Sequence, residues 1–200
     1  MIRFPMTAKK LVQKLGNQFG DDISKPAKFR GEVTMTLNKA NLVVGVCQFA
    51  KDELGFDYLV DLSMVDHYGE DPRFEVVYEL CGLEHGCHLR LKTRVSEEAG
   101  ELPSVTGVWR TADWHEREAY DMMGVKFTGH PNLKRILMWE GYPHFPLRKD
   151  FPLEGKETNV PDVAFSKPAP LEGGPFVTTP GGESTGDREP RRQNPKDWQD

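Results

Sequence analysis

Three segments between residues 57 and 95 alternate apolar and polar side chains along most of their length. They are residues 57–67, 73–80 and 87–95, and the second of them reads RFEVVYEL. A period of two sends successive side chains to opposite faces, which is typical of strands in a sheet with one buried face. The connections between the segments are short and contain glycine. We therefore expect neighbouring strands to pair antiparallel, as a meander.

Two helices and a further strand are predicted before this sheet. Residues 7–19 place apolar side chains at helical intervals, with Thr7 as the N-cap. Residues 41–54 show the same spacing, and Gly55 ends this second helix. Between the two helices, residues 32–37 read EVTMTL, an alternating pattern with β-branched residues that predicts a strand.

A third helix is predicted after the sheet. Residues 97–103 have the composition of a loop, and a short turn of helix is expected at 105–109. Thr111 or Asp113 caps a charged helix that runs to residue 123, where Gly124 ends it. We therefore expect an α+β fold: a small, mostly antiparallel sheet with helices packed on one face, plus an extended C-terminal tail.

The composition changes after residue 154. Residues 155–200 contain seven of the fifteen prolines, two glycine pairs and few apolar side chains, with no helical or strand period. Such a segment cannot form a core of its own. We predict one α+β domain at residues 1–154 and an extended or disordered arm at 155–200, whose few apolar residues would anchor on a partner.

The charge balance argues against one large class of functions. The chain has 31 acidic and 26 basic side chains, a formal net charge of -5. Non-specific nucleic-acid binding needs an excess of Lys and Arg to neutralise phosphates, so we expect no nucleic-acid partner. No apolar run approaches the roughly 18 to 20 residues that span a bilayer, and the N-terminus lacks the apolar core of a secretory signal. Membrane association is therefore expected only through a partner.

The three cysteines are Cys47, Cys81 and Cys87. A small, odd number is typical of a chain from a reducing compartment without a disulfide framework. Residues 81–88 read CGLEHGCH, for which a metal site is one interpretation. Because this spacing is not a usual one for zinc, a turn joining two strands is the favoured interpretation.

The segment 115–153 combines dense charge with several glycines and prolines. It contains no nucleophile elbow, phosphate-binding loop or metal-ligand spacing. Rigid backbone and displayed charge without these signatures favour a docking or assembly surface over a catalytic pocket.

The carboxylates of the charged helix allow two interpretations. Glu116, Glu118 and Asp121 are candidate catalytic groups, but Glu116 and Glu118 are two residues apart and point to different faces of a helix. The alternative is ion pairing, beginning with Arg117 and Asp121 at a spacing of four. Cations that could pair with the remaining carboxylates are Lys134, Arg135, Arg148 and Lys149. Structural or interface pairing is the favoured interpretation.

The end of the segment is predicted to be rigid. His130 precedes a proline, which keeps it out of the helical conformation, so we expect a hydrogen-bonded corner residue rather than a base. Residues 146–153 read PLRKDFPL, bounded by prolines. We expect an extended run there that displays Arg148, Lys149 and Asp150 to another protein.

These residues match a known family motif. The chain resembles the thirty-kilodalton-type subunit of respiratory complex I, which is the C-type subunit of bacterial NADH-quinone oxidoreductase. That motif has a Glu-Arg-Glu triplet, an acidic residue, two apolar residues, a His or Lys, a basic residue and two final apolar residues. The matching residues are Glu116, Arg117, Glu118, Asp121, Met122, Met123, His130, Lys134, Ile136 and Leu137.

The resemblance extends over about residues 30–155, with one local departure. The family commonly reads Trp or Phe, then EGHPLRKD, whereas this chain has WEGYPHF before Pro146. This changes the corner that precedes the basic run and leaves the motif itself intact.

The resemblance implies a non-catalytic structural subunit in the peripheral arm of a proton-translocating NADH-quinone oxidoreductase. It would lie on the cytoplasmic side of the bacterial inner membrane and dock on the forty-nine-kilodalton-type neighbour, the D-type subunit, supporting electron transfer from NADH to quinone. FMN, iron–sulfur clusters and quinone would be bound by other subunits, with no cofactor, metal or catalytic residue in this chain. The motif and docking residues would be Glu116, Arg117, Glu118, Asp121, His130, Lys134, Arg135, Arg148, Lys149 and Asp150.

Two other hypotheses stay open. The equivalent subunit of a membrane-bound nickel–iron hydrogenase or of a ferredoxin-fed complex shares much of the motif. A free-standing enzyme would instead use Glu116, Glu118 or Asp121 together with His130, and it would need a concave pocket around them.

Overall fold

The computed structural model describes residues 8–153, 163–164 and 167–168. The helices and strands, in chain order, are α1 (Ala8–Phe19), β1 (Ala27–Phe29), β2 (Glu32–Leu37), α2 (Val43–Asp52), β3 (Tyr58–Asp66), β4 (Phe74–Gly82), β5 (Cys87–Val95), β6 (Glu101–Pro103), α3 (Ala112–Met123), β7 (Lys126–Thr128), β8 (Val163–Ala164) and β9 (Lys167–Pro168). The expected Thr7 cap and most of the expected C-terminal arm lie outside the described residues. Of the helices that are described, none combines the length and apolarity that a membrane crossing needs.

The main sheet has five strands in the order β1-β2-β5-β4-β3. The predicted meander is confirmed, since β4 pairs antiparallel with both β3 and β5. The predicted turn at residues 81–88 is also confirmed, because it joins β4 to β5. Strand β2 then pairs parallel with β5, with Thr34 opposite Arg90. The sheet is therefore mixed but mostly antiparallel.

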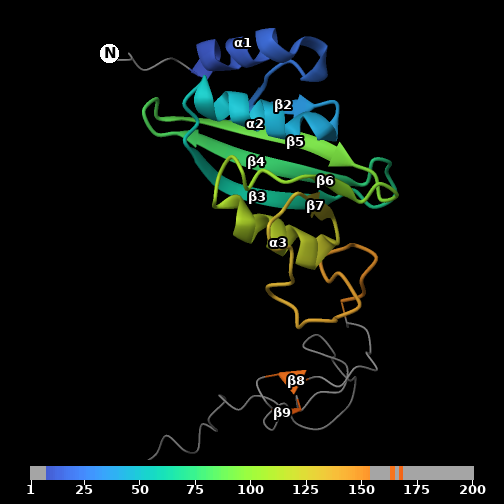
Figure 1. Ribbon diagram of the computed structural model, residues 1–200. Coiled ribbons are helices and arrows are strands. Elements are labelled where there is room, and N and C mark those ends of the chain that lie inside the picture. Colours follow the sequence, from blue (N-terminus) through green and yellow to red (C-terminus); the bar gives the residue numbers. More distant parts are fainter. Residues whose placement is uncertain (1–7, 154–162, 165–166, 169–200) are drawn as a thin grey trace, which may run out of the picture.

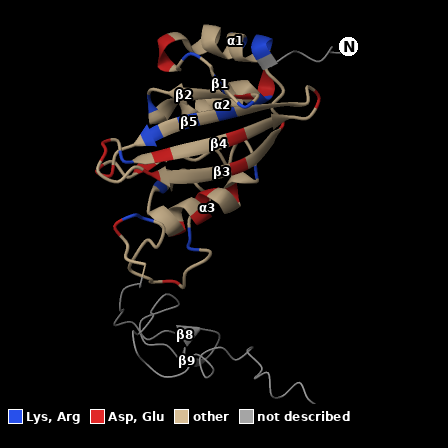
Figure 2. Ribbon diagram, turned by 180° about the vertical axis from the view of Figure 1, so that it is seen from behind, with Lys and Arg blue, Asp and Glu red and all other residues tan. Residues whose placement is uncertain are grey.

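The helices cover one face of this sheet, as predicted. In Figure 1, α2 and α3 lie in front of the strands, and in Figure 2, seen from behind, the strands lie in front. The core between them is built from alternate strand residues such as Met35, Tyr78 and Leu91, each at most 1% exposed. Full burial of one such side chain is worth roughly 1.5–3 kcal/mol, so this layer holds the sheet and helices together.

The opposite face of the sheet is charged. Glu75 and Glu79 on β4 lie across from Arg94 and Arg90 on β5, and Lys92 Nζ lies 2.8 Å from Glu75 Oε1. Figure 2 shows these acidic and basic stretches running along the exposed strands. The alternation in the sequence is thus explained by one apolar face and one face of cross-strand ion pairs.

A small βαβ unit follows the sheet, where a loop was predicted for residues 97–103. Strand β6 lies in that range and pairs parallel with β7, and α3 forms the crossover between them. Gly124 ends α3 with φ +81°, as expected. Thr111 occupies the N-cap position, but its hydroxyl donates to the Leu59 carbonyl of β3 at 3.3 Å instead of capping the helix.

Candidate docking surface

Glu116 is a buried carboxylate that binds the connector between β6 and α3. Its Oε1 accepts the Val105 N–H at 2.7 Å and its Oε2 accepts the Ser104 hydroxyl at 2.6 Å, with 0% of the residue exposed. Burial raises the pKa of Glu116 to about 7, although both hydrogen bonds act to lower it. The expected pairing of Glu116 with a downstream cation is wrong: its partners come from the preceding connector.

Asp121 fixes the segment that follows the βαβ unit. Its Oδ2 accepts the backbone N–H groups of Ile136, Leu137 and Met138 at 2.9, 2.7 and 2.8 Å. Its Oδ1 lies 2.5 Å from Arg135 Nη1. Because three amides and a guanidinium converge on one buried carboxylate, this part of the chain is held firmly against α3.

The predicted pair between Arg117 and Asp121 is wrong. Arg117 Nε donates to the Lys134 carbonyl at 3.1 Å and Nη2 to the Arg135 carbonyl at 3.4 Å. Its guanidinium also lies 5.1 Å from the ring centre of Trp114. Arg117 and Asp121 therefore both bind the same downstream segment, one through its carbonyls and the other through its amides.

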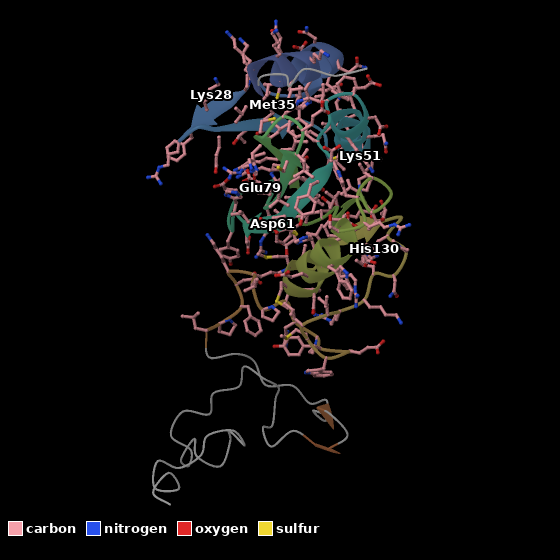
Figure 3. The ribbon with its side chains drawn as sticks, turned by 90° about the vertical axis from the view of Figure 1, so that its left-hand side faces the viewer. Lys28, Met35, Lys51, Asp61, Glu79 and His130 are labelled. Atoms are coloured by element: carbon pink, nitrogen blue, oxygen red, sulfur yellow. The ribbon has the colours of Figure 1, made fainter. Side chains whose placement is uncertain are left out.

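His130 forms the hydrogen-bonded corner that the sequence predicts. Its Nε2 lies 3.2 Å from the Asp113 carbonyl oxygen and 3.3 Å from Asp113 Oδ1, and its Nδ1 accepts the Asn132 N–H at 3.0 Å. The accepted hydrogen bond places the ring proton on Nε2. Figure 3 shows His130 at the α3 end of the molecule.

A second anchoring group centres on Arg73, which sequence analysis missed. Its guanidinium bonds both Asp66 carboxylate oxygens at 2.8 Å, Glu97 at 2.9 Å, and Asp150. We call the five residues Asp66, Arg73, Glu97, Arg148 and Asp150 the Arg73 cluster. The hydrogen bonds from Arg73 lower the pKa of Asp66 and of Asp150.

The predicted extended display of residues 146–153 is wrong. These residues form turns that fold back on the domain, and the Lys149 N–H donates to Asp66 Oδ2 at 2.8 Å. Arg148 Nε donates to the Met123 carbonyl at 2.7 Å, and its Nη1 lies 3.1 Å from Glu97 Oε1. Arg148 and Asp150 are thus engaged within the chain, whereas the Lys149 side chain is exposed.

The candidate catalytic carboxylates do not converge on one point. Glu116 faces the β6–α3 connector, Asp121 faces the downstream segment, and Glu118 is exposed. Within residues 8–153, no hydrogen bond or ion pair involves the Glu118 carboxylate or the exposed Lys134 ammonium. The geometry therefore gives Glu116 and Asp121 structural roles and leaves the exposed groups available to a partner.

Large apolar side chains lie exposed on α3 and on the segment that it holds. Trp114 is 61% exposed, Leu137 57% and Leu147 56%. We call this region the α3 surface. Its members are Trp114, Glu118, Lys134, Leu137, Leu147 and Lys149. Exposed aromatic and aliphatic groups flanked by charges are typical of protein–protein interfaces.

Comparisons with known proteins agree on one family. Residues 36–157 match the family model described as the respiratory-chain NADH dehydrogenase 30 kDa subunit. The C-type subunit 2 of NADH-quinone oxidoreductase from Rhizobium meliloti (strain 1021) is 50% identical over 132 residues, which cover 65% of this chain and 72% of that protein. The C-type subunit of the same oxidoreductase from Geotalea uraniireducens (strain Rf4) is 44% identical over 146 residues, covering 73% and 88%.

Solved structures show the same fold. A trypsin-resistant fragment of Nqo5, residues 1–134, matches with a TM-score of 0.50 and 29% identity, covering 64% of this chain and all of that fragment. A chain of an archaeal membrane-bound sulfane sulfur reductase matches with a TM-score of 0.62 and 22% identity, covering 72% and 85%. The predicted resemblance is confirmed: the chain belongs to the family of the 30 kDa subunit of respiratory-chain NADH dehydrogenase.

Proposed function

We propose that this chain is a non-catalytic structural subunit in the peripheral arm of a proton-translocating NADH-quinone oxidoreductase. It docks on the D-type subunit, the forty-nine-kilodalton type, through the α3 surface. Membership of the family supports the assembly, since its relatives are named as C-type subunits of that oxidoreductase. The observation that carries the docking role is that Asp121 holds the backbone at the exposed Leu137, and that the Arg73 cluster holds it at Lys149, next to the exposed Leu147.

Rigid presentation matters for affinity. A partner that binds an already ordered segment does not have to offset the entropy of ordering it, which amounts to about 0.5–1.5 kcal/mol for each immobilised side chain. Trp114 and Leu137 are the expected energetic centre, because large apolar and aromatic groups dominate interface energies.

The proposed role is positional. FMN, iron–sulfur clusters and quinone are assigned to other subunits, and electrons pass from NADH to quinone through those groups. The chain then reaches the cytoplasmic face of the bacterial inner membrane only through its neighbours.

The test is purification of the tagged chain from detergent-solubilised native membranes, with mass spectrometry and an NADH–quinone assay on the eluate. We expect the eluate to contain the D-type and flavin-binding subunits and to transfer electrons from NADH to quinone. Hydrogenase subunits without NADH oxidation would assign the chain to the related complex instead. A monomer with nothing bound would contradict both assignments.

The docking site is tested by the double variant Trp114→Ala/Leu137→Ala. Loss of a central apolar anchor costs at least about 2 kcal/mol, roughly a 30-fold weaker interface. The matched control is Leu83→Ala, since Leu83 is 70% exposed in the turn between β4 and β5. Native gels should show less assembled complex for the double variant and a wild-type amount for the control. Equal assembly of all three proteins would remove the α3 surface from the interface.

A further inference from the structure

A groove lies between α1 and the first two strands, with a volume of about 440 Å³. Its floor is mainly apolar and includes Val12 of α1 and Val33 of β2, each 5% exposed. Lys9 on α1 and Lys28 on β1 also line it. Figure 3 shows Lys28 at the α1 end of the molecule. The groove thus offers an apolar floor bordered by cations.

Gly16 lines this groove from the interior of α1. A glycine there costs about 0.5–1 kcal/mol of helix stability relative to alanine. Gly16 is not among the glycines with positive φ, and nothing in the described chain lies within 4 Å of the place where a Cβ would stand. Neither backbone conformation nor packing within residues 8–153 requires a glycine there, and the missing side chain leaves room in the groove for a ligand close to the helix.

The surroundings of the groove are positively charged. Residues 8–30 contain six Lys and Arg and two Asp, in a chain whose net charge is -5. Helix α1 has three lysines and no acidic residue. Among the described residues, Lys9, Lys14 and Lys28 take part in no ion pair, and Asp22 is paired with Lys39 at 2.9 Å. The local potential therefore favours an anionic ligand over a neutral one.

We propose that this groove binds an acidic, amphipathic segment of a partner protein. Its apolar side chain would lie over Gly16, against Val12 and Val33. Its carboxylates would face Lys9 and Lys28. This is a docking surface separate from the α3 surface and does not depend on the proposed function.

A peptide is a better occupant than a lipid surface. Membrane-binding helices insert a free apolar face into the lipid. In α1 that face is used within the fold, since Leu11 and Leu15 are 0% exposed in the core. What remains for a ligand is a groove of about 440 Å³ lined by Lys9 and Lys28, a size that accommodates a short peptide segment.

The test is site-specific photo-crosslinking in the native assembly. A benzophenone amino acid replaces Gln13, which lines the groove, and in the control it replaces Gln48, which is exposed on α2. After irradiation of membranes, mass spectrometry identifies the crosslinked peptide. We expect position 13, and not position 48, to capture a peptide of another polypeptide in which Asp or Glu flanks apolar residues.

Variants distinguish binding in the groove from mere proximity. Gly16→Leu fills the groove and should lower crosslinking from position 13 at least tenfold. Gly45→Leu should leave it unchanged, because Gly45 is also a helical glycine with open space and does not line the groove. The double variant Lys9→Glu/Lys28→Glu should lower the crosslinking yield from position 13 by a similar factor, because carboxylates in place of both cations would repel an acidic ligand.

Four outcomes would overturn the proposal: crosslinks to lipid, to another copy of this chain, to residues 1–7 or 154–200 of the same chain, or to a peptide without acidic residues. Absence of any crosslink from position 13 would do the same. A crosslink that persists unchanged in Gly16→Leu would place the partner outside the groove.

Discussion

Three carboxylates within residues 9–153 are fully or nearly buried, and each is stabilised by different groups. Asp66 is bonded by the Arg73 guanidinium, Asp121 by three amides and Arg135, and Glu116 by one amide and one hydroxyl. Only Glu116 has no cationic partner, and burial raises its pKa. A buried carboxylate keeps its charge when a cation replaces water, so the pKa of Asp66 is lowered whereas that of Glu116 is raised.

The Glu116→Gln variant should remove one pH dependence of stability. In the folded chain the carboxyl titrates near 7 instead of at the usual 4.5, so the folded state holds the proton more tightly. The free energy of unfolding should therefore fall as pH rises from about 4.5 to 7, by about 3 kcal/mol from this group. Denaturant titrations give the free energy of unfolding of both proteins at pH 5 and pH 8. The change between these pH values should be smaller in the variant than in the wild type. An equal change in both proteins would contradict a raised pKa of Glu116.

Loss of the Arg73 guanidinium should be strongly destabilising. Arg73→Ala leaves Asp66 buried without its cation, which costs about 3–5 kcal/mol. Arg110→Ala is the control, because Arg110 is exposed and lies outside every ion pair found in the described residues. Thermal unfolding should separate the two variants clearly, and similar melting temperatures would show that the Arg73 cluster contributes little.

At the scale of elements, residues 130–153 form a strap across α3 and the edge of the sheet without a helix or strand of their own. Their order comes from side chains elsewhere in the fold: Asp121 and Arg117 from α3, and Arg73, which directly precedes β4. The backbone of this irregular segment is hydrogen-bonded by side chains of other elements. Its order should therefore be lost when one of these donors or acceptors is removed.

Asp121→Ala should release this strap. The three amides and Arg135 lose their acceptor, and limited proteolysis should then cut between residues 130 and 145 at much lower protease concentration. Glu118→Ala removes a carboxylate from the same helix where it is exposed, and should leave the cleavage pattern unchanged. Identical patterns for both variants would mean that the strap is held by other contacts.

Gly124→Ala should disturb the junction between α3 and the strap. Gly124 has φ +81°, and an added Cβ would stand 2.7 Å from the Phe145 ring and 2.8 Å from Arg148. The positive φ costs about 1 kcal/mol for alanine, and the crowding adds to it. Gly45→Ala, in open space, should be neutral or stabilising. A variant as stable as the wild type would require Phe145 and Arg148 to move aside at no cost.

The sequence predicted those elements in which the spacing of apolar residues shows which face is buried. Strands β3, β4 and β5 alternate because one face is apolar, and Gly124 marks the end of α3. It did not predict β1 or β6, which have three residues each and show no period. Nor did it predict the partners of Glu116 and Asp121, because their hydrogen-bond donors are mostly backbone amides, which have the same form at every residue.

At the scale of the whole molecule, the two proposed docking surfaces lie at opposite ends. Figure 1 shows α1 at one end and α3 with residues 130–153 toward the other, separated by the sheet. A chain with two distant surfaces can join two neighbours that do not touch each other.

This arrangement predicts independent effects on assembly. Variants at distant sites without shared partners have additive free energies. The fold losses of complex in Gly16→Leu and in Trp114→Ala/Leu137→Ala should therefore multiply when the changes are combined, as measured by quantitative native gels. If the triple variant forms as much complex as the more impaired of its two parent variants, the two surfaces do not act independently.

The parallel pairing of β2 with β5 also has a consequence for synthesis on the ribosome. Thr34 of β2 pairs with Arg90 of β5. The edge of β2 that faces β5 therefore stays unpaired until β5 has been translated. The antiparallel β4–β5 pair joins residues much closer in sequence and closes a shorter loop. The β3–β4 pair is equally local and is translated earlier, so the nascent chain should build its sheet from β3 and β4 outward, adding β5 and then β2. Until β5 is added, the core-facing apolar residues of β2, such as Met35, lack this strand as a neighbour, and such exposed surface favours aggregation.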